Sequence, residues 1–268
     1  LTNAKLQGAG GLLNIAYKIS DYSTIGFTAW YQQYDRQIPP ALFESISLKD
    51  QKDNSLRLML DWQRHKDRTK CYAKAAYVKD GIDYKDNAIG IMSTSHTQQY
   101  FQEIGWEWQA ARHHKLMLFA PVQISSIDRP ELHDTKQQTR VALAAAYIYT
   151  ILHDKLNIAA DLRGESINAQ SIVLPGLNAS YQLFPCLLIK ANAQRTYRAP
   201  TLNELYFVPW GNTSLKPEQG WNYDAGYTLK VKLAEGLTLI HDAAIFDRLI
   251  HDWIIWLGAP ILTPHNIA

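Results

Sequence analysis

The chain has 268 residues, with 27 Lys and Arg against 25 Asp and Glu, so its net charge is only +2. That balance, together with the absence of a basic run, excludes the usual nucleic-acid-binding classes. The two cysteines, Cys71 and Cys186, lie far apart and outside any C-x-x-C motif, which excludes a disulfide framework. The longest nearly apolar run, Val141 to Leu152, is shorter than the roughly 20 residues of a membrane-spanning helix.

The dominant pattern along the chain is alternation with a period of two, which predicts β-strands with one apolar and one polar face. In residues 55–63 the apolar positions are Leu56, Leu58, Leu60 and Trp62. Similar alternation follows at 140–150, 156–165 and 221–231, although the second face of 140–150 is small and apolar rather than charged. About twelve such strands are expected over the whole chain.

Short connectors and longer loops alternate between these strands. The short ones fall near residues 20–23, 66–69, 111–114, 152–155, 183–186 and 232–236. The longer ones are expected at about 37–53, 80–97, 127–136, 164–173 and 198–218. This rhythm is typical of antiparallel up-and-down transmembrane β-barrels, which have tight turns at one end and long loops at the other.

The positions of aromatic and charged side chains favour the same fold. Near five of the short turns an aromatic residue stands on the apolar face, namely Tyr17, Trp62, Trp108, Tyr149 and Tyr181. Tyr and Trp gather at membrane–water interfaces, because their rings prefer lipid and their polar tips prefer headgroups. The other face carries Arg57, Asp61, Glu103, Glu107, Arg140, Asp161, Arg163, Asp224 and Lys230. Such a lining suits a wet lumen, whereas a soluble all-β module, the alternative, would fill its interior with apolar groups.

One irregular segment is far more specific than the rest of the chain. The stretch "YRAPTLNELY", followed by "GNTSLKPEQGWNYDAGY", resembles the late-barrel motif of TonB-dependent outer-membrane receptors, of the cobalamin and siderophore type. We call residues 198–226 the signature segment. Its matching positions include Arg198, Pro200, Asn203, Glu204, Leu205, Tyr206, Gly211, Asn212, Lys216, Pro217 and Glu218.

The resemblance implies the domain organisation. Family barrels have about 22 strands around a plug, and the matching stretches correspond to their middle and late parts. Residues 1–268 are therefore expected to form a partial receptor barrel, roughly twelve strands of a larger one, without a plug domain.

Several residues of the signature segment have a predicted local role. Arg198 and Glu218 stand at the two feet of the loop and are expected to pair, the alternative being that both are simply solvated. Asn203 is expected to cap a short helical turn. The dipeptide Gly211-Asn212 suits a turn with positive φ.

The function implied by the resemblance is import of a scarce large ligand, an iron–siderophore, haem or cobalamin, across the bacterial outer membrane. Energy would come from an inner-membrane TonB complex acting through a plug outside this chain. Ligand contacts are expected from Tyr84, Trp210, Asn212 and Trp256, with loop anchoring as the plainer role for each. A non-transporting structural or adhesion barrel is the rival within the membrane class.

No enzyme is expected, because no catalytic motif such as G-x-S-x-G occurs. No cofactor is expected either, and the near-neutral charge leaves no reason to expect a nucleic-acid partner. Three carboxylates, Asp80, Asp83 and Asp86, fall in one expected loop and are weak candidates for calcium. Their plainer interpretation is a solvated, charged loop.

Overall fold

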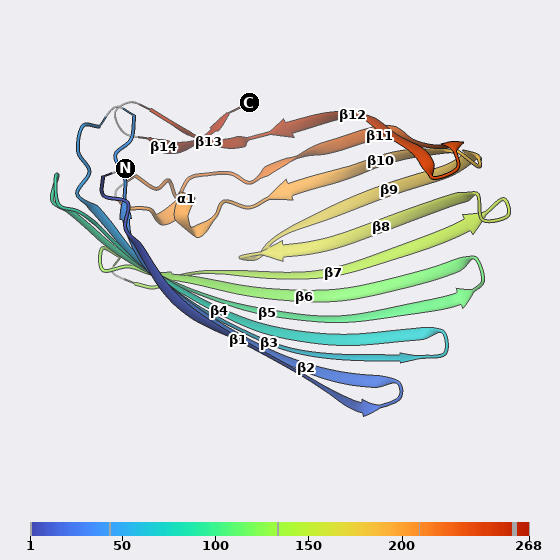
Figure 1. The fold of residues 1–268 in the computed structure, drawn as a ribbon, viewed down its shortest axis with the longest axis horizontal. Helices are drawn as coiled ribbons and strands as arrows, with labels where there is room; N and C mark the ends of the chain where they lie inside the picture. Colours follow the sequence, from blue (N-terminus) through green and yellow to red (C-terminus); the bar gives the residue numbers. More distant parts are fainter. Residues whose placement is uncertain (1, 43, 133, 209, 259–261, 268) are drawn as a thin grey trace. The chain divides into compact units, whose positions relative to one another are not determined.

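The computed structural model describes residues 2–42, 44–132, 134–208, 210–258 and 262–267. Twelve strands follow one another in sequence order in a single antiparallel sheet, and two further strands form a small second sheet (Figure 1). The strands of the large sheet are β1 (Leu6–Ser20), β2 (Ser23–Ile38), β3 (Lys49–Lys66), β4 (Thr69–Asp86), β5 (Ile91–Ala111), β6 (His114–Asp128), β7 (Lys136–Ile151), β8 (Leu156–Ile167), β9 (Gln170–Phe184), β10 (Leu187–Arg198), β11 (Glu218–Ala234) and β12 (Leu237–His251). The small sheet pairs β13 (Trp253–Leu257) with β14 (Thr263–Ile267), and the helix α1 spans Leu202–Tyr206. Among the described residues no helix is long and apolar enough to cross a membrane.

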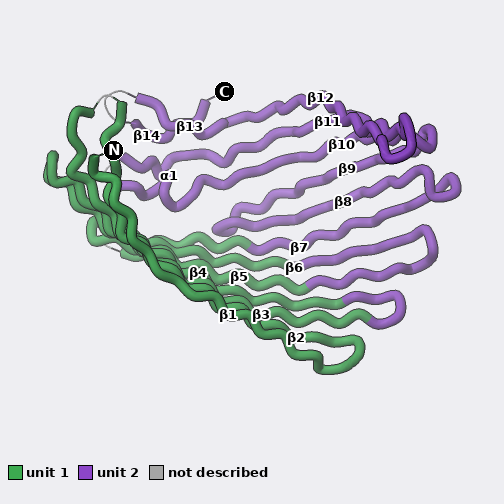
Figure 2. Tube along the Cα trace, in the orientation of Figure 1, with its two compact units in different colours: residues 1–65, 71–104, 121–140 green, residues 66–70, 105–120, 141–268 purple. Residues whose placement is uncertain are grey.

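The chain divides into two compact units (Figure 2). Unit 1 comprises residues 1–65, 71–104 and 121–140, and unit 2 comprises residues 66–70, 105–120 and 141–268.

In unit 1 the strand register separates an apolar face from a polar one. Phe27 lies opposite both Ile15 of β1 and Leu60 of β3, so these three side chains share a face. On the other face Asn14 donates to the Thr28 hydroxyl at 2.9 Å. The two faces predicted from the alternation in residues 55–63 are therefore confirmed.

Unit 2 shows the same separation. Leu177 lies opposite Ala160 and Ala193 on the apolar face. On the polar face Asn178 donates to Asp161 at 3.3 Å, and Asn192 donates to Asp224 at 2.8 Å. Side chains on this face thus satisfy one another across neighbouring strands, as a hydrated lining requires.

Large apolar side chains on the apolar faces of both units are exposed. Leu60 is 49% exposed, Leu143 is 66% exposed and Leu177 is 53% exposed. Large apolar side chains in such numbers are costly to leave in water, whereas hydrocarbon accepts them readily. Tyr17 and Trp62 both lie beside Ile25 at the turn end of this face, which is the interfacial position predicted for them.

Two of the predicted long loops are wrong. The loop placed at 80–97 shrinks to residues 87–90, because β4 continues to Asp86 and β5 begins at Ile91. The loop placed at 164–173 is only a two-residue turn, at Asn168 and Ala169, which have φ of 46° and 69°. Paired positive φ values give the tight turn that joins twisted antiparallel strands, so the polar residues on either side continue the ladder.

Candidate functional site

The signature segment is built around the single turn of helix α1. Thr201 caps it, since its hydroxyl accepts the backbone N–H of Glu204 at 3.2 Å. The Glu204 carboxylate returns to the backbone N–H of Thr201 at 2.7 Å, which completes a capping box. The predicted cap at Asn203 is therefore wrong. Asn203 lies inside the helix, and Thr201 provides the cap because Glu204 follows it at the spacing that the box requires.

Arg198 joins this helix to the two strands that flank the loop. Its Nη1 donates to both carboxylate oxygens of Glu204, at 3.0 and 3.1 Å, and its Nη2 donates to Glu218 Oε1 at 2.6 Å. Arg198 and Glu218 also lie opposite each other where β10 and β11 meet. The predicted Arg198–Glu218 pair is confirmed. We call these three residues the arginine clasp; the planar guanidinium suits it because it donates in two directions at once.

Glu218 makes a further contact, with the β13–β14 hairpin. The backbone N–H of Ile254 donates to Glu218 Oε1 at 2.8 Å, and both residues are buried. Two asparagines add to this contact. Asn266 accepts the N–H of Lys216 at 2.8 Å and donates to its carbonyl at 2.9 Å, and Asn212 donates to the Pro264 carbonyl at 3.0 Å. The signature loop and the hairpin are thus held together by side-chain bonds to backbone.

Protonation of Glu218 is expected to weaken the clasp. Glu218 lies at the loop end of β11, before Trp221 and the apolar stretch of that strand. The hydrogen bond from Arg198 lowers the pKa of Glu218 below its ordinary 4.5; partial burial opposes this shift, and the Ile254 N–H adds to it. Because the folded-state pKa is the lower one, the stabilisation is complete above a pH of about 4.5 and is lost as pH falls through the folded value.

The measurement is the urea midpoint of unfolding between pH 6 and pH 3. We expect a fall in this midpoint below about pH 4.5 and a smaller fall in Glu218→Gln, which keeps the acceptor oxygen but cannot titrate. Equal falls in both proteins would show that Glu218 does not contribute.

Two of the predicted ligand residues lie together. The ring of Phe207 is 5.6 Å from that of Trp210 and 6.1 Å from that of Trp256, measured between centroids. All three side chains are partly exposed. We call them the aromatic cluster; it joins the signature loop to the β13–β14 hairpin.

The other two predicted ligand residues lie elsewhere. Asn212 is engaged within the loop, where it accepts the N–H of Ser214 at 3.0 Å in addition to its bond to Pro264. Tyr84 lies in unit 1, near the end of β4. Phe207 was missed by sequence reasoning, although its place one residue after Tyr206 marks it as part of the same segment.

The remaining signature residues shape the loop. Pro200 is buried, Leu205, Tyr206 and Pro217 are partly buried, and Lys216 is exposed. Gly211 does not have the positive φ predicted for the Gly211-Asn212 dipeptide, and neither does Asn212. Glycine is required there by close approach, because a Cβ would stand 2.6 Å from the Phe207 nitrogen.

The three carboxylates considered for calcium are not brought together. Asp80, Asp83 and Asp86 all belong to β4, and a spacing of three puts Asp83 on the face opposite the other two. Asp83 accepts the Thr94 hydroxyl at 2.8 Å, and Asp86 accepts the Ala88 N–H at 3.0 Å. In the described part of the chain no group of three or more His, Cys, Asp or Glu could hold a metal ion.

The family model "TonB dependent receptor-like, beta-barrel" matches residues 3–267. The vitamin B12 transporter BtuB of Photobacterium profundum is 42% identical over 48 residues, which is 18% of this chain and 8% of that protein. The siderophore receptor PirA of Pseudomonas aeruginosa has a similar fold, with a TM-score of 0.80 at 14% identity over 98% of this chain and 51% of PirA. A variant of the ferric enterobactin receptor PfeA of Pseudomonas aeruginosa gives 0.79 at 14% identity, over 98% of this chain and 47% of PfeA. The chain therefore spans about half the length of these solved structures.

Proposed function

Since the chain belongs to the TonB-dependent receptor-like β-barrel family and lies in the bacterial outer membrane, we propose that it forms part of the barrel of an active importer. The family consists of receptors and transporters rather than enzymes. The proposed cargo is a scarce large ligand, an iron–siderophore, haem or cobalamin. In this proposal residues 1–268 are middle and late strands, the plug lies outside this chain, and a TonB-type complex supplies the energy through that plug.

The observation that carries the proposal is the fixed position of the aromatic cluster. Phe207 and Trp210 follow α1, which the arginine clasp holds, and Trp256 belongs to the hairpin whose Ile254 N–H is bound by Glu218. Rings that are held in place and partly exposed suit a large ligand, because little conformational entropy is lost when they bind it. Trp and Tyr are also the side chains that dominate the energetics of many binding surfaces.

The Trp256→Ala variant is expected to bind and import the ligand about tenfold less efficiently, and Trp210→Ala similarly, because each removes one ring from the cluster. The measurement is uptake of radiolabelled ferric siderophore, haem and cobalamin, each tested separately, by cells that carry the protein. Trp253→Ala is the matched control: it lies on β13 with Trp256, on the opposite face, and is 52% exposed. Equal loss in all three variants would contradict a role for the cluster.

Energy dependence separates the importer from its rivals. Uptake of the ligand by cells with the wild-type protein is expected to stop when a protonophore dissipates the proton gradient across the inner membrane. Binding of the ligand at the cell surface is expected to persist. A structural or adhesion barrel would show no uptake of any of the three ligands in either condition. A soluble all-β module would be recovered without detergent.

A further inference from the structure

A row of side chains on the polar face of unit 1 takes no part in the proposed transport function. Trp30, Gln32 and Tyr34 alternate along β2, on the face that also carries Thr28. Trp30 and Tyr34 are each 41% exposed, and Gln32 is half-buried between them. We call these three residues the aromatic row. Two large rings with so much open surface on a hydrated face indicate a binding surface rather than core packing.

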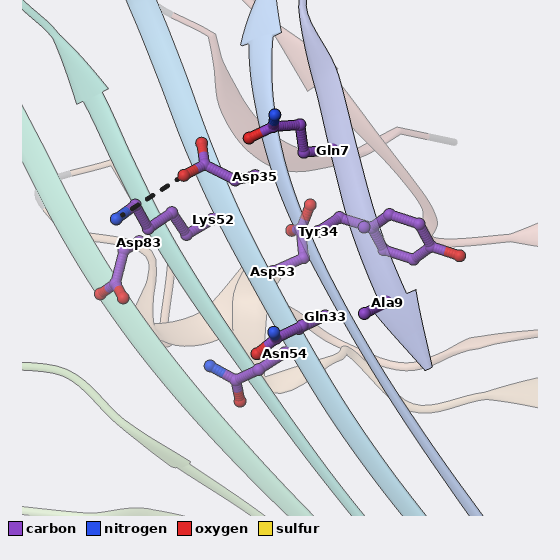
Figure 3. Close-up of a pocket in the computed structure, with 10 residues that line it drawn as sticks. Gln7, Ala9, Gln33, Tyr34, Asp35, Lys52, Asp53, Asn54 and Asp83 are labelled. Atoms are coloured by element: carbon purple, nitrogen blue, oxygen red, sulfur yellow. Dashed lines mark ion pairs between the residues drawn. The ribbon is translucent and has the colours of Figure 1, made fainter. Parts of the chain in front are cut away.

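The neighbouring strand β1 leaves the aromatic row uncovered on one side. Gln32 lies opposite Gly10, and Tyr34 lies opposite Gly8. A Cβ at Gly8 would stand 2.6 Å from Tyr34 Cε1, so the ring lies where a side chain of β1 would otherwise be. Figure 3 shows this ring lying across β1; most side chains around the hollow in that view, including Gln33, project from the opposite face. The two glycines thus add no side chain that could cover the row.

Two ion pairs border the aromatic row. Trp30 lies opposite Arg57 of β3, whose guanidinium carbon stands 4.7 Å from the centre of the Trp30 ring. Nη2 of Arg57 is 3.9 Å from Asp80 Oδ1. Further along β2, Arg36 Nε is 3.1 Å from Asp53 Oδ2. Each of these cations is matched by a carboxylate, so the two pairs add no net charge to the border of the row.

The combination of rings, an amide and paired charges suits a polyhydroxylated ligand. The face of an aromatic ring carries partial negative charge, which attracts the polarised C–H groups on the flat side of a sugar ring. The Gln32 amide donates and accepts hydrogen bonds, guanidinium groups donate and carboxylates accept, and a sugar hydroxyl can do both. An anionic ligand would instead need a cation that no carboxylate already neutralises.

The length and the place of the row favour a chain of sugars from outside the cell. Trp30 and Tyr34 are four residues apart, which corresponds to about 14 Å along an extended strand. That distance exceeds a single sugar ring, so only several linked rings could contact both residues. Tyr34 lies close to the end of β2 at Ile38, where the long loop 39–48 begins. Family barrels place their long loops outside the cell.

We propose that the aromatic row binds an uncharged oligosaccharide. One sugar ring stacks on Trp30, another stacks on Tyr34, and hydroxyls between them bond the Gln32 amide and the two ion pairs. The site is separate from the proposed transport function, because it shares no residue with the aromatic cluster or the arginine clasp.

The test is isothermal titration calorimetry of the protein in non-ionic detergent with maltohexaose and with cellohexaose, two uncharged oligosaccharides of different shape. At least one of them is expected to bind with a Kd of about 1 mM or below. The Trp30→Ala and Tyr34→Ala variants are each expected to bind it about tenfold more weakly, because each loses one stacking ring. Tyr31→Ala is the matched control, since Tyr31 lies between them on the opposite face of β2 and is 46% exposed. It is expected to bind as the wild type does.

A conservative variant and a charged sugar complete the test. Tyr34→Phe keeps the ring and is expected to keep the wild-type affinity. Hexagalacturonate carries a carboxylate on every sugar and is expected to bind about tenfold more weakly than the neutral hexasaccharide. Tighter binding of hexagalacturonate would show that the ligand class is anionic and the proposal wrong. Failure of both neutral sugars to bind, or the same affinity in Trp30→Ala, Tyr34→Ala and Tyr31→Ala, would also overturn it.

Discussion

The Arg198→Ala variant is expected to have a free energy of unfolding about 2–3 kcal/mol below that of the wild type. It is also expected to expose residues 199–217 to proteases. The side chains of Glu204 and Glu218 are only 11% and 10% exposed, and both carboxylates depend on the same guanidinium. Without it, two like charges remain close together in a partly buried place. The expected loss stays below that of a fully buried pair, because Arg198 itself is 39% exposed and is screened by solvent. Urea unfolding and limited proteolysis measure the two effects.

Two further variants identify the cause of that loss. Arg195→Ala removes an arginine from the same strand whose contacts are weaker, both at 3.3 Å, and should cost less than about 1 kcal/mol. The combined Arg198→Ala/Glu204→Gln/Glu218→Gln variant should regain part of the stability, because no charge is left unpaired. If Arg198→Ala alone is as stable as the wild type, the clasp is not what holds the loop.

The faces of the strands could be predicted from the sequence, because a period of two has only one structural meaning in a sheet with a wet side and an apolar side. Leu60 and Asp61 fall on opposite faces as the alternation requires. The six short connectors could be predicted as well, since they interrupt that alternation, whereas the tight turn at Asn168 and Ala169 was taken for a long loop. In both cases the information is local, and neither depends on a contact between distant residues.

The ends of the strands could not be predicted with the same accuracy. Polar residues at the end of β4, including Asp83, look like a loop in sequence, yet their backbone continues the ladder. Polarity indicates exposure to water, and a strand that extends beyond the membrane is as exposed as a loop is. The calcium candidates depended on that loop, so the same error led to them.

Of the contacts in the arginine clasp, the sequence predicted the Arg198–Glu218 pair but not the part played by Glu204. Arg198 and Glu218 stand at the feet of the loop, and the pair followed from that symmetry. The part played by Glu204 was missed, although Thr201 and Glu204 have the spacing of a capping box and could have indicated it. The contact between Glu218 and Ile254 joins residues 36 apart, and no local pattern in the sequence indicates it.

The largest expected effect comes from a charge on the apolar face. The Leu60→Arg variant should lose about 2–4 kcal/mol of folding free energy in phospholipid vesicles. Leu60 lies among Leu56, Leu58 and Trp62 on the apolar face of β3, so an arginine there would have to enter hydrocarbon. The Met59→Arg variant carries the same substitution one residue away on the polar face, beside Thr28, and should cost less than about 1 kcal/mol. Urea titration of both proteins in the same vesicles measures the difference. An equal cost at the two positions would mean that the leucine face does not contact lipid, and the assignment of the two faces would then be wrong.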